Sequence, residues 1–292
     1  MLLEGREMPG GRRPGPRPRI RVRRPRIPPF RRRDLPGIYL AVLVFGLVAP
    51  LLPMPPVAPQ AAVVVPAIAP APPPPPPVQV ELVAPGPVVP RAEVLNRLAD
   101  ARTVALTFDD GPDPRWTPQV LAVLQRHGAV ATFCMIENSA AAHESLVRQV
   151  VAAGNRLCDH SRTHDEQLPD RKPETITDEV VTAGTDLSAV AGGAPVAWYR
   201  APGGNWSTDI ATLSADHGMQ PLGWNIDPKD WEQPGADAIV AAVQRQLQLQ
   251  APDGGIILMH DGGGDRDETV AALEQLIPWL VAHGYKFGFP VP

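Results

Sequence analysis

No charged side chain occurs between Leu35 and Val80, although charged residues make up 20% of the 292-residue chain. This absence excludes an ordinary solvated surface segment. Within the stretch, residues 37–52 are almost wholly apolar, which predicts a membrane anchor at residues 35–54. A spanning helix needs roughly 20 apolar residues, so the anchor has the minimum length and must accommodate Pro36, Pro50 and Pro53 near its ends.

The N-terminal end has little acidic charge. Residues 1–34 contain 12 arginines and 3 acidic residues, whereas the remaining 258 residues contain 15 basic and 28 acidic ones. Arginines beside an apolar run hold that side of the membrane segment in the cytoplasm. We therefore expect a cytoplasmic tail at residues 1–34 and a protein that crosses the cell membrane once. Its contact partner there is the lipid membrane, and everything after residue 54 lies outside the cytoplasm.

Two other interpretations of this end compete with the anchor. A cleaved signal peptide also has a basic start and an apolar middle, and it would give a secreted protein. The small-residue site Ala67-Ile68-Ala69 is followed by proline, which suits a spacer better. An arginine-rich arm could also contact nucleic acid phosphates. Because the arginines adjoin an apolar segment, membrane topology is the simpler explanation, and no nucleic acid partner is expected.

Proline is concentrated before the C-terminal part, with 24 of 38 prolines preceding residue 91. This density excludes helix and sheet interiors there. Residues 55–95 are expected to form a semi-rigid polyproline spacer, at about 3.1 Å per residue, or a disordered tether without preferred reach. About 200 residues remain, which is enough for one α/β domain at residues 96–292.

Within this domain, short β-branched runs alternate with amphipathic segments that have helix start and stop signals. The expected strands are 103–108, 131–136, 156–159, 197–200, 220–226, 255–259 and 285–287. The expected helices are 117–127, 140–153, 175–191 with a capping box at Thr175, 207–218 with Ser207 as cap, 237–249 and 267–282. This pattern predicts an α/β fold, a distorted (β/α) barrel of about seven βα units. Functional residues should gather at the C-terminal ends of its strands.

Polar side chains do follow these strands. The first strand runs into Asp109 and Asp110, whose mutual repulsion a cation would offset. The third runs into His160 and His164, and this four-residue spacing can place both imidazoles on one face, close enough to share a metal. Two imidazoles, one carboxylate and an open position form a known catalytic zinc set. Taken singly, each motif could equally be a capped loop or a pair of exposed histidines.

Three further motifs end later strands. Arg200 follows the fourth strand, Asp230 and Trp231 follow the fifth, and Leu258 and His260 lie at the end of the sixth. Singly, the arginine could face solvent, the tryptophan could be core packing, and the histidine could be structural. Five polar groups at the ends of five strands nevertheless favour one active site.

The ordered set TFDDGP, HSRTH, RAPGG, DPKDW and IILMH resembles the five motifs of the polysaccharide deacetylase family, also called the NodB-homology domain or family 4 carbohydrate esterases. The resemblance covers about residues 100–292. It implies a distorted (β/α) barrel, a divalent metal that is most often Zn²⁺, and hydrolytic removal of acetyl groups from sugars of a polysaccharide or oligosaccharide.

The resemblance also implies a role for each matching residue. Asp110, His160 and His164 would be the metal ligands. Asp109 would be the general base, Arg200 would hold it ionised and oriented, His260 would be the general acid, and Asp230 would tune His260. Trp231 and Leu258 would form walls of the acetyl pocket, and the backbone N–H of Gly203 would donate to the oxyanion.

Two features depart from the family pattern. Gly203 stands where many members have an aromatic residue, which predicts a wider or differently walled groove and puts substrate preference in doubt. The loop after His164 carries the acidic pair Asp165-Glu166, where many members have a less acidic stretch. Cys134 and Cys158 fall on neighbouring expected strands and could form a disulfide or remain two buried thiols.

Three functions are compatible with these motifs. The first is N-deacetylation of peptidoglycan or a chitin-like glycan, favoured by a location outside the membrane. The second is O-acetyl ester hydrolysis on xylan-like polymers, because the same metal site can cleave esters. The third is a non-catalytic glycan-binding module, against which the intact Asp109 and His260 argue, since binding requires neither a base nor an acid.

Overall fold

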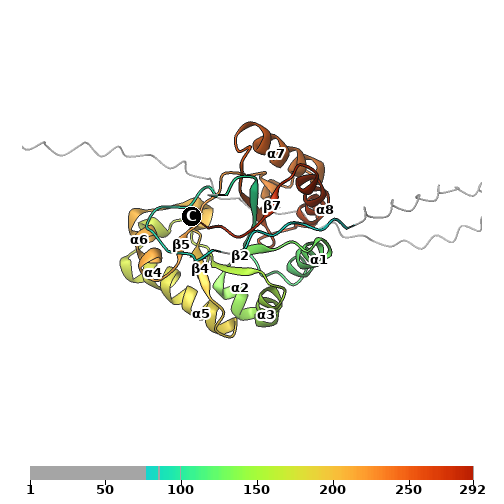
Figure 1. The fold of residues 1–292 in the computed structure, drawn as a ribbon. Coiled ribbons are helices and arrows are strands. Elements are labelled where there is room, and N and C mark those ends of the chain that lie inside the picture. Colours follow the sequence, from blue (N-terminus) through green and yellow to red (C-terminus); the bar gives the residue numbers. More distant parts are fainter. Residues whose placement is uncertain (1–76, 85, 99, 292) are drawn as a thin grey trace, which may run out of the picture. The chain divides into compact units, whose positions relative to one another are not determined.

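The computed structural model describes residues 77–84, 86–98 and 100–291 (Figure 1). The expected cytoplasmic tail, the membrane anchor and the first part of the spacer lie outside these residues. Among the described residues, no helix combines the length and the apolar character needed to cross a membrane.

The core of the molecule is a parallel sheet. Its strands are β1 (Thr103–Asp109), β2 (Ala131–Met135), β3 (Arg156–Asp159), β4 (Val196–Tyr199), β5 (Gln220–Pro221), β6 (Gly254–His260) and β7 (Lys286–Phe287). Their order is β5-β4-β3-β2-β1-β6, and β7 pairs with the first residues of β1. Every residue of β1 is buried, as expected for a central strand covered on both faces.

Helices surround this sheet (Figure 1). They are α1 (Thr117–His127), α2 (Glu137–Ala142), α3 (Glu144–Ala152), α4 (Pro173–Thr177), a π-helical segment (Asp178–Thr182), α5 (Ala183–Val190), α6 (Thr208–Asp216), α7 (Ala236–Leu249) and α8 (Asp267–Ala282). Their apolar faces and the buried strand residues form one main core, in which the rings of Phe108 and Phe133 stack 5.3 Å apart.

The sheet curls until its two ends meet. Ile226, five residues after β5, forms a parallel bridge with Ile257 of β6, and Leu258 N donates to Ile226 O at 2.9 Å. The expected strand 220–226 is therefore regular only at Gln220 and Pro221, and its far end reaches the opposite edge of the sheet. A curled parallel sheet enclosed by helices agrees with the predicted distorted barrel.

Helix boundaries differ from expectation where local signals compete. The expected helix 140–153 is interrupted at His143, whose backbone leaves the helical region. The helix expected from Thr175 begins instead at Pro173, with no side-chain cap, because proline fits the first helical turn without losing a hydrogen bond. The cap at Ser207 is confirmed, since its side chain accepts from Ile210 N.

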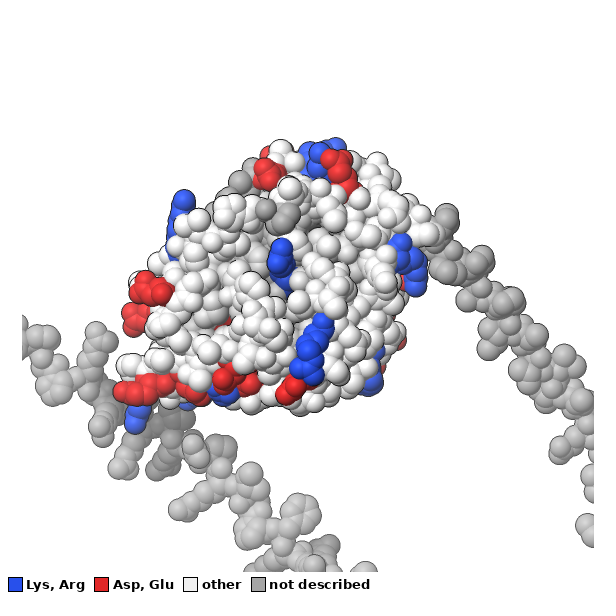
Figure 2. Space-filling model, turned by 60° about the horizontal axis from the view of Figure 1, so that its bottom comes forward, with Lys and Arg blue, Asp and Glu red and all other residues white. Residues whose placement is uncertain are grey.

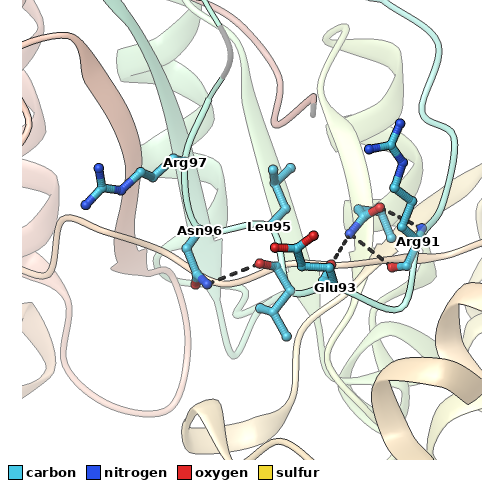
Figure 3. A pocket seen from close by; sticks show the side chains of 7 residues that line it. Arg91, Glu93, Leu95, Asn96 and Arg97 are labelled. Carbon is cyan, nitrogen blue, oxygen red and sulfur yellow. Dashed lines mark hydrogen bonds between the residues drawn. The ribbon is translucent and has the colours of Figure 1, made fainter. Parts of the chain in front are cut away.

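The described part of the expected spacer lies against the barrel. We call residues 77–84 and 86–98 the strap. Val83 N donates to Phe287 O at 2.7 Å, and Leu95 bridges Leu222 beside β5. Strap residues, among them Arg91 and Glu93, line a pocket (Figure 3). Gln220 of β5 accepts from Arg91 N there and donates to the Glu93 carbonyl oxygen. In this structure the strap is thus part of the folded unit.

The two cysteines lie opposite each other on neighbouring strands. Cys134 of β2 and Cys158 of β3 are register partners, both are fully buried, and a disulfide joins them. Of the two alternatives for this pair, the structure contains the disulfide. The disulfide links β2, which leads into α2, to β3, which leads into the His160 loop.

Candidate active site

The residues singled out in the sequence converge on one cavity of about 500 Å³ at the C-terminal ends of the strands. Its lining includes Asp109, Asp110, His160, His164, Gly203, Trp231, Leu258 and His260. Arg200 and Asp230 lie directly behind this lining, with exposed fractions of 0% and 1%. Parallel connections place all of them at one end of the barrel, because each follows a strand that points the same way.

Three side chains in the cavity form a candidate metal centre. The Nε2 atoms of His160 and His164 lie 3.5 and 3.3 Å from Asp110 Oδ1, and one atom from each residue falls within 4.8 Å of the others. Asp110 Oδ1 is buried and has no hydrogen-bond partner among the described residues. Two imidazole nitrogens facing an unpaired carboxylate oxygen are the donor set of a catalytic zinc site with an open position, so these residues fit a divalent cation.

Neighbouring groups fix the orientation of this centre. His160 Nδ1 lies 2.8 Å from the Arg200 carbonyl oxygen, which requires the proton on Nδ1 and leaves Nε2 facing the cavity. Burial alone would raise the pKa of Asp110, but the adjacent His160 imidazole, together with His260 and His164, outweighs burial and lowers it. Asp110 and His164 both have left-handed backbone conformations, with φ of 70° and 60°, a conformational cost that clusters at functional sites.

Asp109 is held by a buried arginine. Arg200 Nη1 donates to Asp109 Oδ1 at 2.6 Å and to Thr107 Oγ1 at 3.0 Å, and the same guanidinium donates to the Leu222 and Gly223 carbonyls. These bonds fix the carboxylate plane and leave Oδ2 on the cavity side, 3.6 Å from His160 Nε2. Asp109 is therefore placed next to the candidate metal centre, with one oxygen free to accept a proton.

His260 faces the same cavity from β6. Its Nδ1 lies 2.8 Å from Asp230 Oδ1, and its backbone N donates to Asp230 Oδ2. Burial would lower the pKa of His260, but the hydrogen bond and charge of Asp230 outweigh it and raise the pKa. Thr269 Oγ1 in the first turn of α8 donates to Asp230 Oδ2 at 2.8 Å. The imidazolium form of His260 is thus favoured, with its Nε2 directed away from Asp230.

Comparison with known proteins agrees with this geometry. Residues 97–222 match the family described as polysaccharide deacetylase. A chitooligosaccharide deacetylase from Bradyrhizobium is 37% identical over 206 residues, covering 67% of this chain and 91% of the relative. The chain belongs to the polysaccharide deacetylase family.

Two solved structures show the same fold. One is a peptidoglycan N-acetylglucosamine deacetylase, 27% identical, with a TM-score of 0.62 over 68% of this chain and 92% of that one. The other is the carbohydrate esterase domain of a multidomain xylanase from the hindgut metagenome of Trinervitermes trinervoides. It is 28% identical, with a TM-score of 0.55 over 64% of this chain and 87% of that one. The protein is a carbohydrate deacetylase, and enzymes of this family depend on a metal in general.

The deacetylase cavity also contains residues that sequence reasoning did not place there. Trp224, Gly263 and Arg266 line it without belonging to a recognised strand-end motif. Gly204 and Asp227, which belong to the motifs RAPGG and DPKDW but were given no role, line it as well, as does Glu166 beside His164. Nothing in the local sequence indicated a role for Thr269, because its contact with Asp230 joins residues 39 positions apart.

Asp261, next to His260, is a buried carboxyl group whose protonation should make the stability of the deacetylase depend on pH. It is fully buried, and its carboxyl group makes one hydrogen bond in the described structure, with Thr117 Oγ1 at 2.5 Å. Burial raises the pKa of Asp261 to about 7. The folded state therefore retains a proton that the unfolded state releases above about pH 4, so wild-type stability falls as the pH rises through this range.

We expect Asp261→Asn to abolish that loss. In the presence of a chelator, the free energy of unfolding of the wild type should fall relative to the variant by up to about 4 kcal/mol between pH 4 and 7. Urea unfolding at several pH values measures this, with the exposed Asp253→Asn as control. A difference between wild type and Asp261→Asn that does not change with pH would contradict a buried, protonated Asp261.

Proposed function

We propose that the deacetylase hydrolyses the acetamido group of N-acetylated sugars in a polysaccharide, peptidoglycan or a chitin-like glycan, outside the cytoplasm. The observation that carries this proposal is the placement of Asp109 and His260 in the same cavity as the Asp110, His160 and His164 cluster. Relatives named chitooligosaccharide deacetylase and peptidoglycan-N-acetylglucosamine deacetylase support the substrate class.

The residues divide the reaction between them. Asp110, His160 and His164 would hold a divalent metal, most often zinc, which when bound polarises the acetyl carbonyl and makes water more acidic. Asp109 Oδ2 accepts the proton of the attacking water, while Arg200 keeps the other oxygen occupied. Protonated His260 then donates to the departing amine, without which the amine cannot leave.

The remaining cavity residues orient the acetyl group. Leu258 is 4% exposed and Trp231 is 49% exposed, so the two present an apolar wall to the acetyl methyl. The backbone N–H of Gly203 is the proposed donor to the oxyanion of the tetrahedral intermediate. Asp230, fixed by Thr269, keeps His260 charged and directed into the cavity.

The location outside the cytoplasm is a further part of the proposal and depends on residues 1–54 alone. Residues 35–54 would anchor the chain in the membrane, or a cleaved signal would release it. No nucleic acid partner is proposed. On the face in Figure 2, acidic side chains gather along one edge and the basic ones stand apart from one another.

One other activity is favoured by a specific observation. The similarity to the esterase domain of a xylanase suggests O-acetyl ester hydrolysis on a xylan-like polymer, for which the same cavity residues would serve. A non-catalytic binding module would have no use for the Asp109–Arg200 and His260–Asp230 pairs, because each holds a proton-transfer group in a fixed orientation.

Acetate release by the full-length enzyme in detergent tests the proposal. N-acetylglucosamine oligomers, peptidoglycan and acetylated xylan are compared with zinc, with chelator, and with Asp109→Asn. Metal-dependent release from the amide substrates that disappears in Asp109→Asn would establish N-deacetylation. Release from xylan alone would make the protein an esterase, and no release from any substrate with zinc bound would refute the proposal.

A further inference from the structure

Two consecutive glycines shape one wall of the substrate cavity. Gly203 and Gly204 have left-handed φ values of 61° and 69°. A Cβ on Gly203 would lie 3.3 Å from Cδ of Glu166, and a Cβ on Gly204 would lie 2.8 Å from the Trp224 ring. The double glycine therefore leaves room for a carboxylate-bearing side chain and an indole, which form this wall in place of side chains at 203 and 204.

Glu166 is fixed in the wall through its backbone. Asn205 Nδ2 donates to the Glu166 carbonyl oxygen at 3.0 Å, which joins the loop after β3 to the loop after β4. The Glu166 carboxylate makes no hydrogen bond and no ion pair within the described part of the chain. The adjacent Asp165, by contrast, is paired with Arg171 and does not line the cavity.

The two arginines at the cavity are already engaged. Arg200 is buried against Asp109, and Arg266 is 4% exposed and donates to the Gly262 carbonyl oxygen at 2.7 Å. Neither forms an ion pair with Glu166 in the described part of the chain. The Glu166 carboxylate is thus an exposed, unpaired negative charge at the edge of a sugar-sized groove whose other walls include Trp224 and Trp231.

We propose that Glu166 is a specificity-determining residue that binds the ammonium group of a glucosamine unit neighbouring the N-acetylated sugar under attack. The inference rests on the proposed function and names its substrate more closely. The preferred substrate is a partly deacetylated, chitosan-like oligosaccharide, because an already freed amine supplies the cation that Glu166 lacks. An exposed pair of this kind favours the amine-bearing substrate by about three- to fivefold.

The test compares kcat/KM for two defined tetrasaccharides, one fully N-acetylated and one with a single free amine, at a pH where the amine is protonated. The wild type should prefer the amine-bearing tetramer about three- to fivefold, and Glu166→Gln should reduce this ratio to about one. Glu166→Lys should invert the ratio. Asp170→Asn removes an exposed carboxylate four residues away, outside the cavity, and should leave the ratio unchanged.

Salt provides a second measurement of the same contact. Because the contact is solvent-exposed, 0.5 M salt should abolish the wild-type preference and leave the Glu166→Gln ratio as it was. A ratio that is equal in wild type and Glu166→Gln would overturn the inference while leaving the deacetylase function intact. If the wild type releases acetate from neither tetramer, the proposed function itself fails.

Discussion

Asp109→Asn is expected to lower kcat by about 10² to 10⁴, the usual contribution of a general base, while leaving metal affinity close to that of the wild type. Asparagine keeps the size of the side chain, and its oxygen can still accept from Arg200 Nη1. It cannot take a proton from water. Acetate release and chelator competition for zinc, measured on the same preparation, provide both quantities.

A matched control separates loss of the base from loss of charge near the cavity. Asp113 lies four residues further along the same loop and does not line the cavity, so Asp113→Asn should retain turnover. The assignment of Asp109 would be wrong if its asparagine variant kept turnover within tenfold of the wild type. It would also be wrong if the variant lost zinc, because Asp109 would then be a ligand.

Much of this site could be predicted because its residues follow their strands directly. His160 comes one position after β3, and His260 is the last residue of β6, so correct strand ends were enough to bring them together. The limits of α1 and α8 were likewise predicted as observed, because Pro118 and Gly128 mark the ends of α1 by local backbone preference.

The features that sequence reasoning missed depend on contacts between distant parts of the chain. Trp224 enters the cavity because Gly204, twenty residues earlier, leaves room for its ring. Asp261 is paired with Thr117, 144 positions away. The strap is held by Phe287 and Leu222, neither of which leaves a pattern in residues 77–98. Local propensity cannot report such pairings.

β5 is shorter than predicted because its segment also pairs with distant parts of the chain. Residues 220–226 have the composition of one continuous strand, but Leu222 pairs with the strap while Ile226 pairs with β6. Gly223 between them has no room for a side chain, because a Cβ there would meet Asn96 Oδ1. The segment therefore passes from one partner to another, which closes the barrel and cannot be read from its own residues.

His160→Ala is expected to abolish both zinc binding and turnover, in contrast to Asp109→Asn. The variant removes one of three proposed ligands together with the Nδ1 contact to the Arg200 carbonyl. Loss of a residue that only orients a ligand already costs 10- to 100-fold in metal affinity, so loss of a ligand should weaken binding by more than about a hundredfold. Chelator competition measures this directly.

Unfolding measurements distinguish loss of zinc binding in His160→Ala from loss of the folded structure. His160 is buried, so the alanine variant leaves a cavity and loses stability for a reason unrelated to zinc. We therefore expect added zinc to raise the unfolding midpoint of the wild type and of His217→Ala, an exposed histidine outside the cavity, but not that of His160→Ala. Full zinc occupancy in folded His160→Ala would overturn the ligand assignment.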